Sequence, residues 1–302
     1  LQVDGGINVN AIPEITEQGL AWAQINAHQA VGMVGSHYGM SIAIKKAAKC
    51  GIGIANVRQS NHFGAASAYT LMALNHNMIG LAMSNTDVVM NIPGGRGATL
   101  GNNPLSYAVP ARNQPPIVLD IAMSTVAGGK VNSYKDWGTP LPEGWLTDKD
   151  GQPTTDPSVF TVNGALTPFS NHKGYGLALL VESLAGVLAG SAITTDILSW
   201  AQVSDDTCDE GHCFIAIDVG AMMPMDRFYQ RIDELIRRMR EAPTAVGVEQ
   251  TLVPGELEYE SEKISQNEGV PLTRMAVKNL IQLAEDTQLV EQLPFQSTNL
   301  EL

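Results

Sequence analysis

Basic residues are scarce in this chain of 302 residues. Lysine and arginine total 18 against 31 aspartates and glutamates, which gives a formal net charge of −13. This balance argues against the basic surface that nucleic acids and anionic membranes require, so we expect neither as a partner. It does not exclude a small anionic substrate, because a few basic side chains at one site can outweigh the mean charge.

Cysteine is also rare. The three cysteines are Cys50, Cys208 and Cys213, and an odd, low number provides no disulfide framework. This usage fits a reducing compartment, so we expect a cytoplasmic protein. Cys208, His212 and Cys213 lie close together in the sequence, but a zinc site needs three or four converging ligands and no second Cys/His pair lies near them. We therefore predict no metal.

A membrane-spanning run and a signal peptide are lacking too. The chain opens with a polar, glycine-containing segment, VDGGINVN. The most apolar later segment, residues 174–198, contains Glu182 and several small residues, and it predicts a buried helix pair rather than a span. With 44% hydrophobic and 16% charged residues, the chain is expected to form one large or two ordinary globular domains.

Several nucleotide-binding and catalytic motifs are absent. The nearest match to Gly-x-Gly-x-x-Gly, at residues 51–56, has Asn56 in place of the third glycine and overlaps a predicted strand. There is no P-loop, no Gly-x-Ser-x-Gly elbow and no His-Glu-x-x-His. An ordinary Rossmann dehydrogenase, a kinase, a serine hydrolase and a zincin are therefore not expected.

Apolar periodicity predicts alternating helices and strands. Helices are expected at residues 27–50, 65–76, 124–134, 173–190, 225–240 and 274–285. Strands are expected at residues 52–57, 81–84, 105–109, 117–121 and 214–218. Residues 138–157, rich in proline, glycine and aspartate, predict an irregular surface excursion, and residues 253–256 a turn. The alternation indicates an α/β or mixed α+β fold.

The segment from Ser60 to Pro104 is the most informative one. It begins with SNHFG, directly after a predicted strand, and contains the pair Thr86-Asp87 directly after another. Histidine exchanges a proton near neutral pH, and the loop after a strand is where an α/β enzyme holds an acid/base group. For His62, the segment alone leaves a buried structural histidine as the alternative.

Further segments match one family in order. Beside SNHFG, the chain contains PGGRGATLGNNP at 93–104, VLDIAMSTVAGGKV at 118–131, LPEGW at 141–145, HKGYGLALLVESLAGVLAG at 172–190 and VPGE at 253–256. Through nearly its whole length the chain resembles the type 2 malate/L-lactate dehydrogenases. That family also contains ureidoglycolate, sulfolactate and diketogulonate dehydrogenases and an imino-acid reductase. The resemblance implies a non-Rossmann NAD(P)-binding fold of the L-sulfolactate dehydrogenase type, which accounts for the missing glycine fingerprint.

The resemblance implies a two-electron redox reaction. A hydride passes between the carbinol carbon of a small 2-hydroxy acid and NAD or NADP. His62 matches the family's acid/base histidine, and an imidazole can take the alcohol proton and return it in the other direction. Asp87 is the candidate for the carboxylate that orients the ring and stabilises the imidazolium. The alternative for Asp87 is a residue that caps a turn.

A cofactor surface is implied as well. The expected contacts are Thr86, Asp120, Ile121, Ala122, Lys173, Gly174, Gly255 and Glu256. Lys173 would pair with a cofactor phosphate, aided by backbone N–H groups near Gly174 at a helix start. The alternative for Lys173 is a solvated lysine, and the alternative for Asp120 is a cap for the helix that follows it. Gly94, Gly95 and Gly101 are expected to form turns rather than to contact a ligand.

The chain departs from the family pattern in several places. Relatives usually begin further upstream, with a Ser-His-Gly-x-x-Arg-like stretch whose arginine is expected to hold the substrate carboxylate, so we expect that group upstream of Leu1. Ser170-Asn171 replaces the usual Gly-Gly before Lys173. Cys208 replaces an arginine of at least some relatives, which bears on substrate choice.

The sequence thus predicts an NAD(P)-dependent dehydrogenase for a small anionic 2-hydroxy or 2-oxo acid of the malate, lactate or ureidoglycolate type. The alternatives are a cyclic imino-acid reductase on the same scaffold and a catalytically inactive, cofactor-binding homologue. The resemblance further implies a substrate-side domain from residues 1–60 and 241–302 and an NAD(P)-binding domain from residues 61–240. It also implies a homodimer with active sites near the interface.

Overall fold

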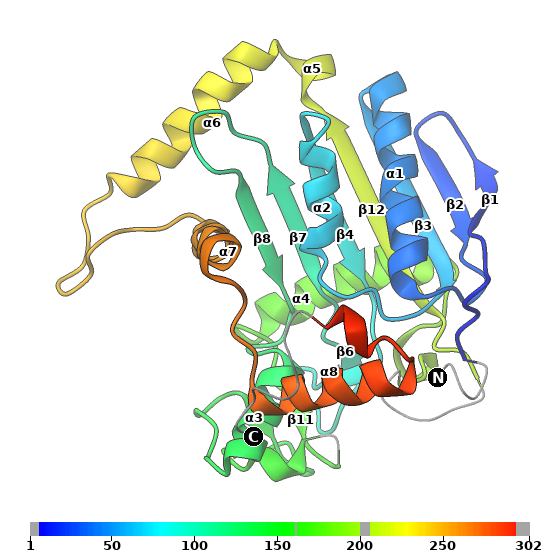
Figure 1. Cartoon of the computed structure of the whole chain (residues 1–302), viewed down its shortest axis with the longest axis vertical. Helices are drawn as coiled ribbons and strands as arrows, with labels where there is room; N and C mark the ends of the chain where they lie inside the picture. Colours follow the sequence, from blue (N-terminus) through cyan, green and yellow to red (C-terminus); the bar gives the residue numbers. More distant parts are fainter. Residues whose placement is uncertain (1–5, 161, 200–205, 294–302) are drawn as a thin grey trace. The chain divides into compact units, whose positions relative to one another are not determined.

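A mixed β-sheet forms the centre of the computed structural model, which describes residues 6–160, 162–199 and 206–293. The chain divides into two compact units, the first ending at Gly255 and the second beginning at Glu256. The first unit contains a seven-stranded sheet with the strand order β1-β2-β3-β12-β4-β7-β8 (Figure 1). This architecture confirms the mixed α/β fold class expected from the sequence.

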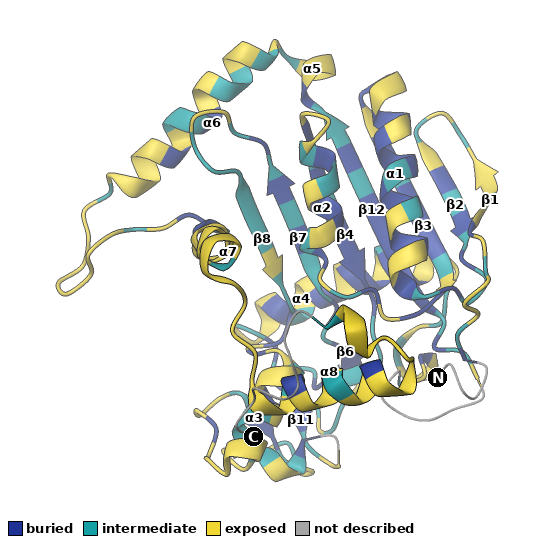
Figure 2. Ribbon diagram, in the orientation of Figure 1, coloured by how far each residue is buried: buried dark blue, intermediate teal, exposed yellow. Residues whose placement is uncertain are grey.

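The strand that holds the sheet together comes late in the chain. Strand β12 lies between β3 and β4 and runs antiparallel to both, whereas β2 runs parallel to β3. The strands of this sheet are β1 (Glu14–Gln18), β2 (Trp22–Asn26), β3 (Ile52–Ser60), β4 (Met78–Ser84), β7 (Leu105–Val109), β8 (Ile117–Ile121) and β12 (Glu210–Asp218). Figure 2 shows that β3, β12 and β4 are the most deeply buried of them.

Helices cover both faces of this sheet. Helices α1 (Gly32–Cys50) and α2 (Ser67–Leu74) pack on one face, in a core that includes Phe214. Helix α4 (His172–Val181) runs on into a π-helical stretch, Glu182–Val187, which packs with Cys213 on the other face. Successive residues of a strand point to opposite faces, so Cys213 and Phe214 serve the two cores in turn.

A smaller five-stranded sheet begins directly after Asp87. Its order is β10-β9-β11-β5-β6, and with helix α3 (Gly128–Trp137) it encloses a core that includes Met90, Leu146 and Leu166. Its strands are β5 (Val88–Met90), β6 (Leu100–Gly101), β9 (Leu146–Thr147), β10 (Pro153–Thr154) and β11 (Ala165–Leu166). Asp87 therefore lies at the junction between the two sheets.

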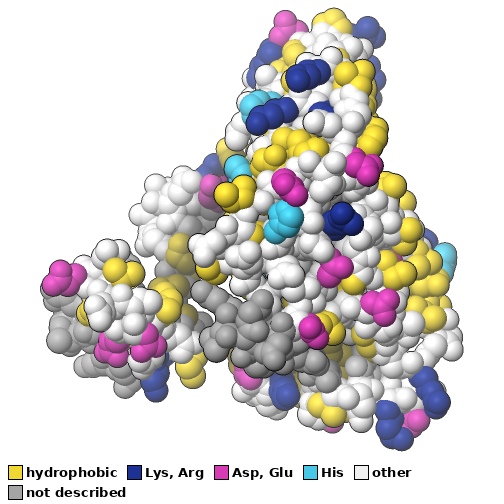
Figure 3. Space-filling model, turned by 90° about the vertical axis from the view of Figure 1, so that its right-hand side faces the viewer, with side chains coloured by type: hydrophobic (Ala, Val, Ile, Leu, Met, Phe, Trp, Pro, Cys, Tyr) yellow, Lys and Arg dark blue, Asp and Glu magenta, His cyan; other side chains and the backbone are white. Residues whose placement is uncertain are grey.

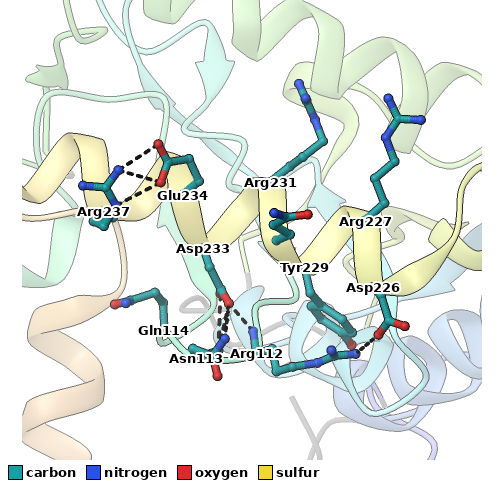
Figure 4. Close-up of a pocket in the computed structure, with 11 residues that line it drawn as sticks. Arg112, Asn113, Gln114, Asp226, Arg227, Tyr229, Arg231, Asp233, Glu234 and Arg237 are labelled. Carbon is teal, nitrogen blue, oxygen red and sulfur yellow. Dashed lines mark hydrogen bonds and ion pairs between the residues drawn. The ribbon is translucent and has the colours of Figure 1, made fainter.

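The far end of β12 leads into α5 (Val219–Met222) and the amphipathic helix α6 (Met225–Arg240). A cavity of about 610 Å³ beside α6 is drawn in Figure 4. There the Asp233 carboxylate accepts hydrogen bonds from the backbone N–H and side-chain amide of Asn113. Arg112 pairs with Asp226 at 2.8 Å and lies 4.3 Å from the ring centre of Tyr229.

These paired charges fasten α6 to the loop after β7. In Figure 4, Arg227 and Arg231 point away from that loop. Helix α6 follows the end of β12 opposite to His62, and β12 itself is about 26 Å long by its rise per residue. The hollow beside α6 is therefore an attachment site for the helix and is remote from the predicted acid/base group.

The second unit contains two helices, α7 (Glu256–Glu268) and α8 (Arg274–Asp286). Thr273 caps α8, since its hydroxyl oxygen accepts a hydrogen bond from the Ala276 N–H. Short 3-10 turns complete the chain at Pro157–Val159, Thr194–Asp196 and Val290–Gln292. None of the helices in the described part of the chain is both long and apolar enough to cross a membrane.

The surface carries mixed charge. On the face shown in Figure 3, acidic and basic side chains are interspersed with hydrophobic ones over the described residues. Opposite charges are also paired in sequence along α6, where Glu234 contacts both Arg237 and Arg238. Such ion pairs three or four residues apart stabilise an exposed helix by only a few tenths of a kcal/mol each.

Several sequence predictions need correction. The helix expected from residue 27 begins at Gly32, because His28 and Gln29 have φ angles of 51° and 64°, which no α-helix contains. The buried helix pair expected at residues 174–198 is α4 with its π-helical extension, and several of its leucines are exposed. The irregular excursion at 138–157 contains the short pair β9 and β10.

Candidate active site

His62 owes its position to an irregular end of β3. The pairing of β3 with β12 shifts register between Ser60 and Val57, where Gln59 has a φ of 50°. The Gln59 N–H donates to the Asp209 carboxylate at 2.8 Å instead of to the sheet. This bulge ends the strand and leaves His62 exposed at the end of the sheet where β3 and β4 finish.

A second histidine lies behind the first. His212 is fully buried, with Nδ1 2.9 Å from Ser84 Oγ and Nε2 2.9 Å from Ser60 Oγ. Its ring stacks on Phe63 at a centroid distance of 4.8 Å. Burial, followed by the proximity of His62, lowers the pKa of His212 to about 3, so the ring stays neutral. His212 is thus a buried, hydrogen-bonded histidine that packs behind His62.

Asp87 reaches the same edge from β4. Strands β3 and β4 both end where β12 begins, because β12 is antiparallel to each. Burial lowers the pKa of His62, and the Asp87 carboxylate opposes this effect by stabilising the protonated ring. Asp87 also lines a cavity of about 410 Å³ together with Phe160 and Ser199. The structure thus brings the predicted acid/base and its predicted partner together.

Thr86, beside Asp87, is fixed by two asparagines that sequence reasoning missed. Its hydroxyl donates to Asn102 Oδ1 at 3.1 Å, and its N–H donates to Asn103 Oδ1 at 3.2 Å. The Asn102 carbonyl accepts from the Met123 N–H at 2.7 Å, which places Thr86 close to the end of β8. The sequence signal that could have identified these two asparagines is the Asn-Asn-Pro tripeptide at the end of the 93–104 motif.

The Asp120-Ile121-Ala122 segment ends β8 and leads to Met123. The Asp120 carboxylate accepts a hydrogen bond from the Ser67 N–H at 2.7 Å. Asp120 therefore caps α2, the helix that follows His62, and not the helix after itself as the alternative reading held. This bond joins the segment predicted to contact the cofactor to the helix next to the acid/base.

Lys173 and Gly174 begin α4 beside the same segment. Gly174 is buried, and a Cβ there would lie 2.6 Å from the Met123 carbonyl oxygen, so only glycine fits. The Gly174 N–H already donates to Phe169 O at 2.9 Å, and the Tyr175 N–H to Asn171 O at 3.2 Å. An anion at this helix start would therefore meet the exposed Lys173 side chain rather than these amides.

The turn before α4 is strained. Ser170 and Asn171 have φ angles of 46° and 57°. Both residues line a cavity of about 560 Å³ together with Thr125 and Thr167. Residues that carry a Cβ adopt a positive φ at a steric cost, which a glycine would not incur.

Gly255 approaches β8 from the other side. Its φ is 94°, a Cβ there would lie 2.9 Å from the Val118 carbonyl oxygen, and Pro254 O accepts from the Val118 N–H at 3.0 Å. Gly255 thus lies beside the strand that ends in Asp120. Glu256 begins α7 in the second unit.

Two buried glutamates near the site were not expected. Glu182, in the π-helical stretch, accepts hydrogen bonds from Asn103 Nδ2 at 2.8 Å, the Thr194 N–H at 2.9 Å and Asn85 Nδ2 at 3.4 Å. Glu210 begins β12 and is fully buried. For Glu182 the available signal was a single acidic residue within the apolar 172–190 motif, whereas Glu210 lies outside the recognised motifs.

No group of three or more His, Cys, Asp or Glu side chains is arranged to hold a metal ion among residues 6–160, 162–199 and 206–293. Cys208 and Cys213 are both buried, and burial raises the pKa of each thiol to about 12. At neutral pH they are therefore uncharged thiols.

Comparison with known proteins places the chain in a family. The model of the family "Malate/L-lactate dehydrogenase" matches residues 2–281. The L-sulfolactate dehydrogenase of Methanocaldococcus jannaschii is 34% identical over 285 residues, which cover 94% of this chain and 81% of that protein. The structure of the sulfolactate dehydrogenase from that organism matches with a TM-score of 0.86, at 34% identity, over 95% of this chain and 82% of that one.

Other relatives carry different names. A Delta(1)-pyrroline-2-carboxylate/Delta(1)-piperideine-2-carboxylate reductase of Pseudomonas putida is 30% identical over 279 residues, covering 92% of this chain and 80% of that protein. The ureidoglycolate dehydrogenase (NAD(+)) of Escherichia coli K12 is 30% identical over 268 residues, covering 89% and 76%. The structural match confirms the expected fold type. The chain belongs to the malate/L-lactate dehydrogenase family of NAD(P)-dependent oxidoreductases.

Proposed function

We propose that this protein transfers a hydride between a small 2-hydroxy acid and NAD or NADP, with His62 as the acid/base and Asp87 as its partner. One observation carries the proposal. His62 and Asp87 follow different strands, β3 and β4, yet lie at one sheet edge and interact electrostatically. A histidine with a carboxylate partner is the arrangement that proton transfer from an alcohol requires.

In the oxidation direction, His62 takes the hydroxyl proton while the hydride leaves the carbinol carbon. The nicotinamide, when bound, supplies the hydride acceptor. Burial lowers the pKa of His62, so its ring is neutral at pH 7 and already in the form of a base. Asp87 then stabilises the imidazolium that results.

Reduction of a 2-oxo acid reverses these roles and their pH dependence. His62 must first carry the proton that it delivers to the developing hydroxyl group. Because the pKa of His62 is lowered, that protonated form is abundant only on the acidic side of its ordinary range. Reduction should therefore be favoured at lower pH than oxidation.

The segments proposed to hold the cofactor are linked to one another by short contacts. Thr86, the 120–122 segment, Gly174 and Gly255 are joined through Asn102, Met123 and Val118. Gly174 and Gly255 accept no Cβ, because the backbones of Met123, Phe169 and Val118 pack directly against them and hold these segments together. Lys173 adds an exposed cation for a phosphate at this surface, and we propose that Glu256 belongs to it as well. The residues present thus fit a dinucleotide.

A homodimer forms part of the proposal. Leu177, Leu180, Val187 and Leu188, on α4 and its extension, are 40%, 48%, 63% and 52% exposed. Apolar side chains at helical spacing on one outer layer are typical of a subunit interface. The same helix starts at Lys173, so this interface would adjoin the cofactor surface. The division into a substrate-side domain (1–60 and 241–302) and an NAD(P)-binding domain (61–240) stays a proposal.

A direct test uses NADH and NADPH with a panel of 2-oxo acids, including oxaloacetate, pyruvate and sulfopyruvate, and with the corresponding 2-hydroxy acids and ureidoglycolate in the oxidation direction. Loss of cofactor absorbance with at least one oxo acid is the expected result. The relative rates name the substrate and the preferred cofactor.

A second candidate is reduction of a cyclic imino acid, favoured by the Pseudomonas putida relative of that name. Here the hydride goes to a C=N carbon and the proton requirement differs. Adding Δ1-piperideine-2-carboxylate to the panel separates the two functions. Oxidation of cofactor with the imine alone would favour this candidate. Cofactor binding without turnover of any compound would favour an inactive homologue.

A further inference from the structure

Glu210 is placed at the proton-transfer edge without a partner. It begins β12 with its Cα opposite that of Ser60, two residues before His62 on the neighbouring strand. Its side chain has no exposed surface, and within the described part of the chain neither carboxyl oxygen has a hydrogen-bond partner. A buried polar group left without a partner is rare in proteins and is commonly explained by function.

The groups around Glu210 do not favour its ionised form. Asp87, after β4, lies close enough to raise the pKa of Glu210, and so adds negative charge. Arg58 of β3 interacts with the neighbouring Asp209, whose carboxylate also binds the Gln59 and Ala192 N–H groups. Other titratable groups nearby are His62 after β3, Glu182 in the π-helical stretch and Cys208 before β12. Strand β12 itself also carries His212, Cys213 and, at its far end, Asp218.

These neighbours keep Glu210 uncharged at neutral pH. A carboxyl group that is desolvated, lacks donors and faces another carboxylate is more stable with its proton. Burial, with a further contribution from Asp87, raises the pKa of Glu210 to about 8. The Cys208 thiol and the His212 ring are neutral as well.

We propose that Glu210, held as a neutral carboxylic acid, sets the affinity of the active site for its anionic substrate. The inference rests on the proposed function, because a 2-oxo or 2-hydroxy acid brings a carboxylate to His62. Glu210 is then a positioning residue that acts through the charge of the site and not by touching the substrate.

Loss of the Glu210 proton would place a second fixed anion beside Asp87. In a buried setting the repulsion between that charge and the substrate carboxylate is weakly screened. Substrate binding should therefore weaken as the pH rises through about 8. The added anion also stabilises the imidazolium of His62, so the chemical step of oxidation should not slow. The effect falls on KM and spares kcat.

The first test measures KM and kcat for the best 2-hydroxy acid between pH 7 and pH 9. In the wild type, KM should rise by about fivefold or more over this range while kcat does not fall. In Glu210→Gln and Glu210→Leu, neither of which titrates, KM should change by less than about twofold. Glu143→Gln removes one exposed carboxylate and should keep the wild-type rise.

The second test needs no turnover. Oxamate, a non-reactive analogue of a 2-oxo acid, is titrated calorimetrically into the cofactor-bound enzyme at pH 8 in buffers of different ionisation enthalpy. Oxamate favours protonated His62 in both proteins, so the readout is the difference between them. The wild type should take up about 0.4 proton more per oxamate than Glu210→Gln, because the bound anion also favours protonated Glu210.

The outcomes separate the two proposals. A working enzyme whose KM rises equally in wild type and Glu210→Gln, with equal proton uptake, would overturn the role of Glu210 alone. An equal loss of activity at every pH in Glu210→Gln and Glu210→Leu would do the same, since it marks a purely structural residue. Failure of every substrate and of oxamate binding would overturn the proposed function, and the role of Glu210 with it.

Discussion

Two buried glutamates, Glu182 and Glu210, differ in the hydrogen bonding of their carboxyl groups. Three donors converge on the Glu182 carboxylate, whereas both oxygens of Glu210 lack a partner among the described residues. The cofactor side is thus a satisfied network that fixes Thr86 through Asn103. The proton-transfer side keeps a carboxyl group whose charge can change. Both carboxyl groups are buried, but only the one without hydrogen-bond donors is expected to change its charge near neutral pH.

The largest expected effect falls on the proton-transfer side. His62→Gln keeps a polar side chain but cannot exchange a proton, so kcat should fall by about a thousandfold or more. Cofactor affinity, measured by fluorescence, should stay within about twofold, because the network around Glu182 is untouched. His76→Gln, at the exposed end of α2, is the matched control. Turnover of His62→Gln within threefold of wild type would refute the acid/base role.

Unfolding by urea tests the two glutamates directly. Glu182→Gln should lower the unfolding free energy by about 2 kcal/mol at pH 7, because one accepting oxygen becomes a donor that faces other donors. Glu210→Gln should raise it by about 3 kcal/mol at pH 7, since folding no longer opposes ionisation of a buried carboxyl group.

The pH dependence gives this second change its sign. The pKa of Glu210 is raised by folding, from 4.5 to about 8, so the folded chain binds the proton more tightly. Stability is then fully present below pH 4.5 and falls as the pH rises towards 8. The gap between wild type and Glu210→Gln should widen over that interval. If the difference in unfolding free energy stayed constant with pH, folding would not raise the pKa of Glu210. Its carboxyl group would then be stabilised in solution much as that of Glu182 is.

A smaller effect is expected from Lys173→Met on the cofactor side. The exposed ammonium group would no longer meet a cofactor phosphate, so the dissociation constant of NADH or NADPH should rise by about tenfold at low salt. The difference should shrink as ionic strength rises. Lys130→Met, an exposed lysine of α3, should leave the constant where it is. If both lysines behave alike, Lys173 is the solvated residue that the sequence allowed.

The smallest effect concerns the turn before α4. Ser170 has a φ of 46°, and Ser170→Gly should raise the unfolding free energy by about 1 kcal/mol by removing the steric cost of that conformation. Ser133→Gly, inside α3, should lower it by a similar amount. A destabilised Ser170→Gly would mean that the serine side chain stabilises this turn.

Several helices and strands could be predicted from the sequence, because short apolar runs end at residues that interrupt helices and strands. The predicted bounds of β7, β8 and α6 agree with the structure. Strands β1 and β2 were missed because the polar β1 edge strand, EITEQ, shows no apolar face. The π-helical stretch was also missed, since its sequence continues the pattern of α4 without a break.

Site residues could be predicted from the sequence only where they follow a predicted strand and belong to a recognised motif. His62, Thr86 and Asp87 satisfy both conditions, and the structure brings them to one edge. Glu210 satisfies neither, because its setting is created by a bulge in a strand from the other end of the first unit. Asp120 was selected from a motif, but its hydrogen bond from Ser67 could not be predicted, because the two residues are far apart in the sequence.

The placement of β12 has a consequence for how the protein is made. Strands β3 and β4 are joined only through β12, which follows them by more than a hundred residues in the chain. Until residues 210–218 emerge from the ribosome, both strands present unpaired edges, and such edges invite pairing between chains. The proton-transfer edge is therefore among the last parts to form, and folding should be slow for a domain of this size.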